Sequence, residues 1–505
     1  MISKVFSSQI TGLKPNIIDI ETDISRGIHS FSVVGLPDKA IEEAKDRISA
    51  AIKNSGLTPP SKGNKKIVVS LAPANIRKEG PIFDLGIAIG ILKATGVVDF
   101  NPKGKLFLGE LSLNGELRPI KGTLLIVEKA KKEGFKEIFL PKENAREAAL
   151  IDELEIFSCE NLKQIIEHLD AKNPNKMKPQ ERTKIERAES SSDIDFADVK
   201  GQESAKRGME IAAAGGHNIT LFGPPGTGKT MLAKAFTGII PPLSFDEIIE
   251  VTSIHSASGL LENELITMPP FRSPHHTSSY VSLVGGGTFP KPGEVTLAHR
   301  GMLFMDEFPE FESRVIEALR QPLEDRIVSV SRARGTMKFP ANFILIAAMN
   351  LCPCGNTGLK EKECICPAGA INKYQRKISG PIMDRIDLWV KVPQIEHAKL
   401  CEKGPAGESS EKIRGRVIRA REIQQKRFDG AKIHLNSEMG VKELKKFSPL
   451  SDECEKLLIS SANCLDLSAR VYHRIIKIAR TIADLEGREA IEAKHILEAL
   501  QYRPK

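Results

Sequence analysis

The sequence predicts a mixed α/β chain with three folded parts: an α/β domain, a parallel sheet with helices on both faces, and a helical C-terminal domain. Two observations carry this prediction. Short apolar runs alternate with helical patterns through the first two parts, which is typical of sheets with helical crossovers. In the last part the sequence has helical periodicity and no strand-like apolar runs. At 505 residues the chain is also too long for one ordinary hydrophobic core.

The boundaries between the predicted parts are set by changes in amino-acid composition and in hydrophobic pattern. Residues 1–170 form the first domain, and residues 171–192 form a linker rich in Lys, Pro, Asn, Glu and Ser. Residues 193–400 form the parallel-sheet domain, and residues 401–505 the helical one. The clearest expected strands are 66–71, 137–140, 219–222, 302–305 and 343–347, and the clearest expected helices are 40–53, 124–132, 413–426 and 469–485.

Composition excludes several classes of protein. Hydrophobic residues make up 41% and charged residues 27% of the chain, as in ordinary globular proteins. Neither a signal core nor a membrane span is apparent, so we expect a cytoplasmic protein without a membrane partner. Eight cysteines in such a chain argue against a disulfide framework. The net charge of +8 fits an anionic partner only if the positive charge gathers on one surface.

A phosphate-binding loop follows the expected strand 219–222 and precedes a helical run. Glycines let backbone N–H groups cradle phosphates, the lysine reaches the β- and γ-phosphates, and the final threonine offers a hydroxyl to Mg²⁺. ATP and Mg²⁺ are therefore the expected ligands. The loop is Gly223, Pro224, Pro225, Gly226, Thr227, Gly228, Lys229 and Thr230.

Polar side chains follow the next two strands of the predicted sheet. Asp306 and Glu307 come directly after strand 302–305, in the manner of a Walker B strand, and Asn350 follows the strand after it. In a parallel sheet these ends meet beside the phosphate loop. We expect Asp306 to hold Mg²⁺, Glu307 to act as the general base on water, and Asn350 to orient that water.

Four cysteines form two closely spaced pairs just after Asn350. Cys352 and Cys354 are separated by nine residues from Cys364 and Cys366. Four thiolates can bind Zn²⁺ in a closed tetrahedral site, although C-x-C is tighter than the usual spacing. The alternative is four unligated thiols in a surface insertion, and the sequence leaves both open.

These motifs together resemble AAA+ ATPases of the helix-2-insert clade, and specifically the magnesium-chelatase-like ComM/YifB family. The resemblance covers nearly the whole chain. Its most specific part is a run of motifs that leads directly into the Asp306 strand, namely FRSPHHT at 271–277, LVGGG at 283–287, PGE at 292–294 and LAH at 297–299.

The resemblance implies a ring, expected to be a homo-hexamer, in which subunits share ATP sites. Arg385, in the segment SGPIMDRID at 379–387, is similar to the family's arginine finger, which completes the neighbouring subunit's site. Arg470 is similar to the second sensor, placed against the γ-phosphate, with Arg474 as the weaker choice.

The first domain resembles the proteolytic domain of Lon proteases, through the run 108–120 and the segment 138–144. Lon-type catalysis needs a serine nucleophile and a lysine base. Those positions hold Ile82 and Leu124, so we expect the fold without its chemistry.

A basic hairpin is expected between residues 324 and 340, and it resembles hairpins that grip DNA in related ring motors. Its basic residues are Arg326, Arg332, Arg334 and Lys338. Contacts to phosphates would make DNA binding sequence-independent and salt-dependent, to single-stranded or branched DNA. The alternative is a solvated hairpin face.

The family implies an ATP-dependent DNA translocase or helicase that drives branch migration. Two other functions remain open: a metal-insertion subunit like that of magnesium chelatase, and a protein-remodelling unfoldase with a Lon-like accessory domain.

Overall fold

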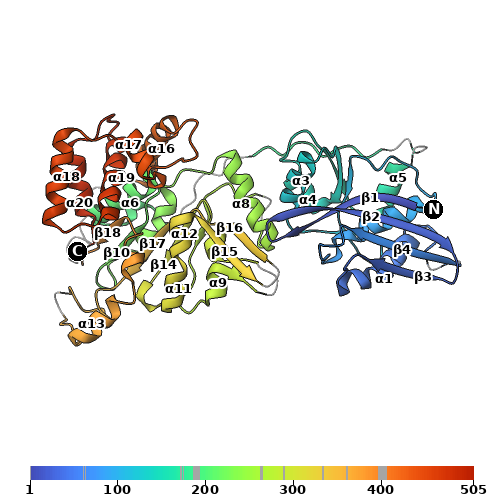
Figure 1. Cartoon of the computed structure of the whole chain (residues 1–505), viewed down its shortest axis with the longest axis horizontal. Helices are drawn as coiled ribbons and strands as arrows, with labels where there is room; N and C mark the ends of the chain where they lie inside the picture. The colour runs from blue at the N-terminus through green and yellow to red at the C-terminus, as the bar shows by residue number, and fades with distance from the viewer. Residues whose placement is uncertain are drawn as a thin grey trace. The chain divides into compact units, whose positions relative to one another are not determined.

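The computed structural model describes residues 2–60, 62, 64–170, 173, 176–185, 194–261, 265–287, 291–332, 335–359, 362–395 and 407–504, apart from the side chain of Arg332. The chain divides into two compact units (Figure 1). The first comprises residues 1–186 and 248–266, and the second comprises residues 187–247 and 267–505. The division after residue 186 falls within the stretch expected to be a linker, whereas the grouping of residues 248–266 with the first unit was not predicted.

The first unit contains a seven-stranded mixed sheet in the order β3-β4-β2-β1-β5-β8-β9. The β1–β2 and β2–β4 pairs are antiparallel and the other neighbouring pairs are parallel. The strands are β1 (Ile2–Thr11), β2 (Lys14–Arg26), β3 (Ser30–Val34), β4 (Lys65–Ala72), β5 (Lys105–Phe107), β8 (Glu137–Pro141) and β9 (Glu155–Cys159).

Helices cover both faces of this sheet because alternate strand residues point to opposite sides. On one face Phe107, Phe139 and Phe157 stack across three strands, with ring centroids 5.0 and 4.9 Å apart, and share a core with α1, α2 and α5. On the other face Leu106 and Ile138 pack in a separate core with α3 and α4. The helices are α1 (Lys39–Asn54), α2 (Asp84–Ala94), α3 (Thr123–Lys132), α4 (Lys142–Ala148) and α5 (Leu162–Leu169).

The first unit also receives most of helix α8 (Phe245–Ser258) from the middle of the chain. The Ser256 hydroxyl accepts a hydrogen bond from the Gly122 N–H at the start of α3, at 3.0 Å. The Thr252 hydroxyl accepts from the Ile266 N–H at 3.1 Å. The bond from Gly122 joins the returning segment to the rest of the first unit, whereas the bond from Ile266 lies within that segment.

The second unit is built on a five-stranded sheet in the order β11-β14-β17-β10-β18, and every neighbouring pair is parallel. Its central strands are apolar throughout, as expected for a sheet buried on both faces. The strands are β11 (Phe271–Arg272), β14 (Met302–Met305), β17 (Ile344–Met349), β10 (Ile219–Phe222) and β18 (Leu388–Lys391). The mixed α/β class with a parallel sheet and a helical C-terminal part is therefore confirmed.

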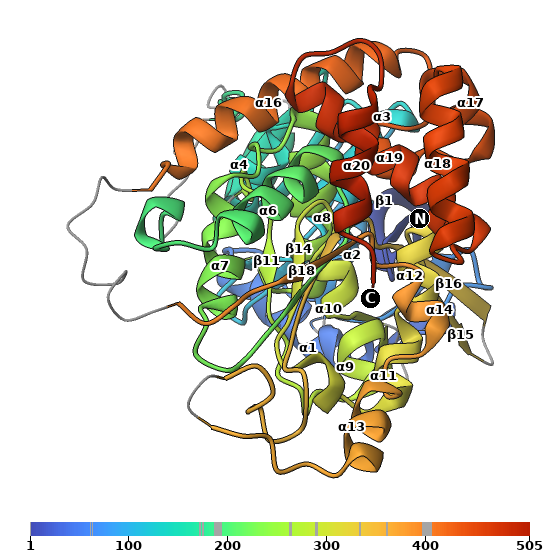
Figure 2. The ribbon, with the colours of Figure 1, turned by 90° about the vertical axis from the view of Figure 1, so that its left-hand side faces the viewer.

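The C-terminal helices share one hydrophobic core with the sheet of the second unit. Ile219 and Leu388 from the strands belong to the same buried cluster as Val417, Leu458 and Ile478 from the helices. Figure 2 shows these helices gathered together, well apart from α13 (Ala368–Gln375). They are α16 (Ser410–Arg427), α17 (Val441–Phe447), α18 (Asp452–Cys464), α19 (Ala469–Leu485) and α20 (Ala493–Gln501), and α6 (Glu203–Gly215) packs beside α16 and α19.

Several predicted elements have the bounds that periodicity gave them. Strands β10 and β14 and helix α19 begin and end at the expected residues. Strand β17 extends from 344 to 349 rather than from 343 to 347.

Of the helices that the structure describes, none is long and apolar enough to cross a membrane.

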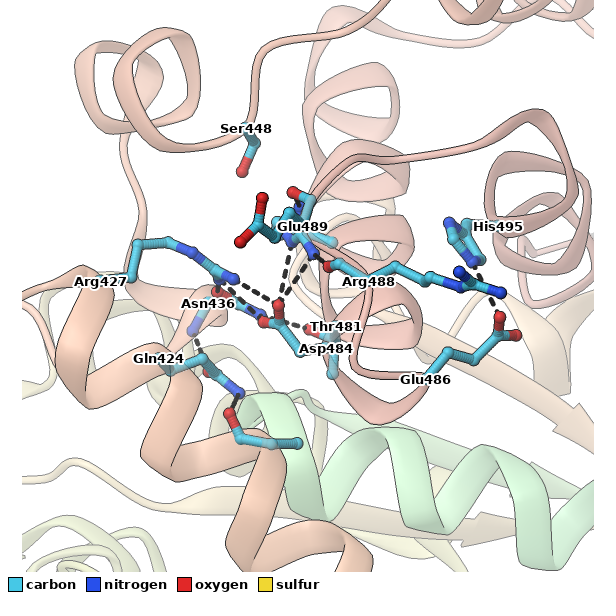
Figure 3. A network of polar contacts seen from close by, with 12 residues as sticks. Gln424, Arg427, Asn436, Ser448, Thr481, Asp484, Glu486, Arg488, Glu489 and His495 are labelled. Atoms are coloured by element: carbon cyan, nitrogen blue, oxygen red, sulfur yellow. Dashed lines mark hydrogen bonds and ion pairs between the residues drawn. The ribbon is translucent and has the colours of Figure 1, made fainter.

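A buried carboxylate joins three elements of the helical part (Figure 3). Asp484 on α19 accepts hydrogen bonds from Arg427 of α16 at 2.8 Å, from Arg480 at 3.1 Å and from Asn436 at 2.8 Å. Its side chain is fully buried. The Asn436 N–H donates to Gln424, whose amide donates to the Ala214 carbonyl of α6. This network fixes the helical part on the sheet domain.

We predict that Asp484→Ala destabilises the second unit by about 3–5 kcal/mol, because it leaves the buried guanidinium group of Arg480 and the half-buried one of Arg427 without their anion. The measurement is the guanidinium-induced unfolding transition of the second unit. Glu422→Ala, which removes an exposed carboxylate from the neighbouring α16, is the control and should change little. Equal shifts in the two variants would contradict the role given to Asp484.

Candidate nucleotide-binding site

The turn between β10 and α7 (Lys229–Ala235) requires glycine at three positions. Gly226 and Gly228 have φ angles of 73° and 90°, in the left-handed region that glycine enters without steric cost. A Cβ atom on Gly223 would lie 2.1 Å from the Val392 carbonyl oxygen, far inside contact distance. The glycines of the predicted phosphate loop are therefore demanded by the backbone.

Lys229 lies within this loop and is only 8% exposed. Its Nζ donates to the carbonyl oxygens of Gly223 at 2.8 Å and Pro224 at 2.7 Å, and to Asn350 Oδ1 at 3.2 Å. Burial lowers the pKa of Lys229, and the nearby Asp306 carboxylate opposes that shift. The ammonium group is thus held in the loop by neutral acceptors, which phosphate oxygens can replace.

Thr230 and Asp306 are brought together across the edge of the sheet. The Thr230 hydroxyl donates to Asp306 Oδ2 at 2.8 Å, which joins the first turn of α7 to the end of β14. A hydroxyl and a carboxylate at this spacing are the hard oxygen donors that Mg²⁺ prefers in nucleotide sites. The pair fits the Mg²⁺ role expected from the sequence.

Glu307 adopts a backbone conformation that is unusual for its residue type. Its φ is 50°, and its N–H donates to Asp306 Oδ1 at 2.9 Å. Non-glycine residues in this region are uncommon and gather at functional sites. The side chain is 56% exposed, so water can reach the carboxylate.

His276 is a neighbour of Glu307 that the sequence analysis did not assign. Its Nδ1 lies 3.6 Å from Glu307 Oε2. The signal was present in the sequence, because His276 belongs to the FRSPHHT string at 271–277. Spacing alone could not show that this string meets the end of β14.

Asn350 follows β17, which lies between β14 and β10 in the sheet. Since all three strands run in parallel, their carboxyl ends meet at one edge. Asn350 therefore joins the phosphate loop and the Asp306–Glu307 pair, and it contacts Lys229 directly. Nearby, burial first and then the charge of Glu310 raise the pKa of Tyr374 to about 12, although a hydrogen bond with the Asn350 backbone opposes the shift.

Arg385 lies at the amino end of β10, whereas the phosphate loop lies at its carboxyl end. Its carbonyl accepts from Asn218 Nδ2 at 3.0 Å, and Asn218 immediately precedes β10, whereas the phosphate loop follows β10. Four strand residues span about 13 Å. The Arg385 guanidinium pairs with Glu324. The structure therefore does not bring Arg385 to the phosphate loop of its own chain.

Arg470 is found beside Arg385 and not beside the phosphate loop of the same chain. Its Nη2 donates to Glu324 Oε1 at 2.5 Å, so one carboxylate holds both arginines. Burial raises the pKa of Glu324, but the two arginines outweigh it and leave the pKa below its ordinary value. These side chains line a cavity of about 380 Å³. The expected placement of Arg470 against the γ-phosphate is thus not seen within one chain.

Arg474, the weaker candidate for that role, is fixed in the structure. It is 5% exposed, its Nε lies 3.5 Å from Asp387 Oδ1, and it donates to the Asp384 carbonyl. Burial lowers the pKa of Arg474, against the charges of the two aspartates.

The expected basic hairpin exists as β15 (Ile327–Arg332) paired with β16 (Gly335–Pro340). Lys338 is exposed on it. Arg326 precedes the hairpin and pairs with Glu438, so it does not share the environment expected for a DNA contact. Arg334 and the side chain of Arg332 lie outside the described residues.

The four clustered cysteines converge. The thiol sulfur atoms of Cys352, Cys354, Cys364 and Cys366 all lie within 4.8 Å of one another, and the group could hold a metal ion. Cys352 is buried and the other three are half-buried.

The two positions of the Lon-type dyad are apolar in the first unit. Leu124 is fully buried at the start of α3, where its N–H donates to Glu147 Oε1 at 3.2 Å. Ile82 packs against the hydrophobic cores of that unit. Neither position offers a nucleophile or a base.

The parallel sheet, its phosphate loop and the polar ends of β14 and β17 define a P-loop protein of the AAA+ type. Models of magnesium chelatase match three segments of the chain: "Magnesium chelatase, subunit ChlI" at residues 195–400, "Subunit ChlI of Mg-chelatase" at 20–144, and the ChlI C-terminal model at 407–503.

Relatives extend this similarity over the whole chain. Competence protein ComM of Haemophilus influenzae is 40% identical over 99% of this chain and 97% of its own length. YifB of Escherichia coli is 39% identical with the same coverage. Lon protease 2 of Bacillus subtilis is 30% identical over 109 residues, 21% of this chain and 19% of that protein.

The chain belongs to the ComM/YifB family of magnesium-chelatase-like AAA+ proteins, with a Lon-like N-terminal region. This confirms the resemblance seen in the sequence. The family implies ATP and Mg²⁺ as ligands.

We predict that two variants separate nucleotide binding from turnover. Lys229→Ala should weaken ATP binding about tenfold or more, because it removes a cation from the phosphates. Glu307→Gln should keep ATP binding but lower turnover by about 10²–10⁴, because an amide cannot act as a base. A fluorescent ATP analogue measures binding, and phosphate release measures turnover.

The control is Lys234→Ala, which removes an exposed lysine from the same helix. Retained turnover in Glu307→Gln would show that another group is the base.

Proposed function

We propose that this chain is an ATP-driven DNA motor that works as a homo-oligomeric ring, as a helicase or branch-migration translocase. The observation that carries the ring is the separation of Lys229 and Asp306 from Arg385 and Arg470 by the length of β10. A finger and a sensor at the far edge serve a phosphate only if it is held by a neighbouring copy. A hexamer is the expected ring.

Each residue has a proposed task in ATP hydrolysis. Lys229 binds the β- and γ-phosphates, and Thr230 with Asp306 holds Mg²⁺, which neutralises phosphate charge when bound. Glu307 takes a proton from the attacking water, and Asn350 orients that water.

His276 has a supporting part in the same proposal. At 3.6 Å from the Glu307 carboxylate, its ring can fix the direction in which the base points. His276 acts through Glu307 and is therefore a positioning residue.

Arg385 and Arg470 supply positive charge from the neighbouring copy. Glu324 holds both guanidinium groups in one chain, and in this proposal its carboxylate is the group that a phosphate oxygen replaces. A γ-phosphate presented across a subunit boundary carries more negative charge than this single carboxylate, and it can take over both partners.

DNA as the substrate is supported by three observations. The hairpin β15–β16 precedes strand β17, which ends in Asn350, so a ligand on the hairpin lies on an element joined directly to the ATP site. Lys338 is exposed on that hairpin, as a contact to phosphate requires. The relative from Haemophilus influenzae is named as a competence protein. We keep Arg332, Arg334 and Lys338 as proposed DNA contacts and omit Arg326.

A magnesium-chelatase-like function is the second candidate, because the matching models describe subunit ChlI. The Lon-like region similarly favours a protein-remodelling function. In both alternatives DNA need not stimulate ATP hydrolysis. ATP and Mg²⁺ serve all three proposals, and we add Zn²⁺ at the four cysteines.

We predict that single-stranded DNA or a four-way junction stimulates ATP hydrolysis in the wild-type protein. Lys338→Ala should weaken DNA binding and lower the slope of log affinity against log salt by about 1, because one phosphate contact is lost. The measurements are phosphate release and fluorescence anisotropy of labelled DNA over a salt series.

Lys432→Ala, which removes an exposed lysine outside the hairpin, should bind DNA like the wild type. ATP hydrolysis that does not respond to any DNA, with intact nucleotide binding, would contradict the proposal of a DNA motor and favour the other two functions.

A further inference from the structure

The four cysteine sulfurs lie within 4.8 Å of one another, and the three of Cys352, Cys354 and Cys364 have the spacing of a tetrahedral metal site. The Sγ atoms of Cys352 and Cys354 are 3.4 Å apart, those of Cys354 and Cys364 are 3.7 Å apart, and those of Cys352 and Cys364 are 3.6 Å apart. Four sulfurs at Zn–S bond length around one Zn²⁺ lie about 3.8 Å from one another. These separations are also far too long for disulfide bonds. The two tight C-x-C pairs can therefore close around one ion.

The surroundings are those of a closed structural site. None of the four thiols is fully exposed, and Cys352 is buried. The Thr357 N–H points at Cys352 Sγ, at 3.4 Å, and such outer hydrogen bonds orient metal ligands and stabilise thiolate charge. Four protein ligands leave no open position for a substrate.

The loop between the two cysteine pairs packs against the phosphate loop. A Cβ atom on Gly355 would lie 3.1 Å from Pro225 Cγ, and one on Gly358 would lie 3.5 Å from Pro224 Cγ. Both glycines have positive φ angles, 78° and 90°. The backbone of the cysteine loop thus lies directly on the two prolines of the phosphate loop.

A second connection runs through the sensor strand. Cys352 lies two residues after Asn350, whose side chain accepts a hydrogen bond from Lys229. The Met349 carbonyl, one residue before Asn350, accepts from the Gly223 N–H at 3.2 Å. The phosphate loop is thus contacted by strand β17 on one side and by the cysteine loop that continues from it.

Few other interactions hold the cysteine loop in shape. Within its described part the hydrogen bonds between backbone groups are those from Gly355 to Cys352 and from Leu359 to Asn356, beside the bond from the Thr357 N–H to the Cys352 sulfur. The Asn356 amide adds a long contact to the Glu363 carbonyl at 3.5 Å. Ordering a loop of this length costs conformational entropy, which a metal ion that joins both ends offsets.

We propose that the four cysteines bind one Zn²⁺ and that the occupied site braces the phosphate loop through Pro224 and Pro225, so that metal loading sets the affinity for ATP. This inference rests on the proposed nucleotide site. The metal is structural, since it reaches the phosphates only through the contacts between the two loops. Because coupling between two ligands is reciprocal, bound ATP must raise the affinity for zinc by the same factor by which zinc raises the affinity for ATP.

The test uses the full-length protein, purified under reducing conditions. Elemental analysis should find about one zinc per chain. Stripping the zinc with a chelator, followed by dialysis into Mg²⁺ buffer, should weaken binding of a fluorescent ATP analogue about tenfold, and adding Zn²⁺ back should restore it. Hydrogen exchange should show lost protection in the peptide that contains residues 223–228.

Cys354→Ser with Cys364→Ser should reproduce the stripped state. The matched control is Cys464→Ser, because Cys464 is an exposed cysteine of the same unit outside the cluster. It should change neither the zinc content nor ATP binding. Reversible stripping of the wild type supplies the answer if the double variant does not fold.

Each outcome has a separate meaning. Absence of zinc from the wild-type protein, together with no uptake of added Zn²⁺, would overturn the metal site. A zinc-loaded protein whose ATP affinity and hydrogen exchange do not change on stripping would overturn the brace while leaving the metal site. A zinc-loaded protein that binds no ATP would instead contradict the proposed nucleotide site.

Discussion

The length of strand β10 is the constraint on which the rest of the ATP site depends. The strand has four residues, is hydrogen-bonded to β17 and β18, and is buried within the sheet. The phosphate loop begins where it ends, and Asn218, which holds Arg385 and Asp387, lies where it begins. A rigid spacer of about 13 Å therefore separates the groups that hold phosphates from the arginines. In one chain Arg385 and Arg470 are paired with Glu324 and not with the phosphate loop, so the proposed chemistry uses a second copy.

This separation also explains the arrangement of the elements around the sheet. The helical part is fixed by the buried Asp484 network, and it carries Arg470 to the same edge as Arg385. Glu324 pairs with both arginines and holds them together. At the opposite edge Lys229, Asn350 and the cysteine loop form one contiguous set of contacts with the phosphate loop. Each edge is thus organised by itself, and ATP is the ligand that would join them across subunits.

The sequence pattern correctly predicted those strands and side-chain contacts that depend on neighbouring residues or on the geometry of a parallel sheet. Strands β10 and β14 and the meeting of Lys229, Asp306 and Asn350 follow from apolar runs that end in polar side chains. The sequence could not show contacts between distant segments. The joining of residues 248–266 to the first unit, the approach of His276 to Glu307, and the shared pairing of Arg385 and Arg470 with Glu324 all depend on tertiary packing. The basic pattern at 326–338 led us to expect Arg326 on the hairpin. It precedes the hairpin and pairs with Glu438, a contact between distant segments that the pattern could not show.

Mixing two inactive variants tests the shared ATP site most directly. Lys229→Ala lacks the phosphate contact, and Arg385→Ala lacks the finger, whose loss should lower turnover by about 10³–10⁵. If the site is completed between copies, combining the two variants forms some boundaries in which an intact Lys229 faces an intact Arg385, and ATP hydrolysis should reappear in the mixture. Mixtures that remain as inactive as either variant alone, although the subunits assemble together, or an Arg385→Ala protein that hydrolyses ATP at the wild-type rate, would contradict this account.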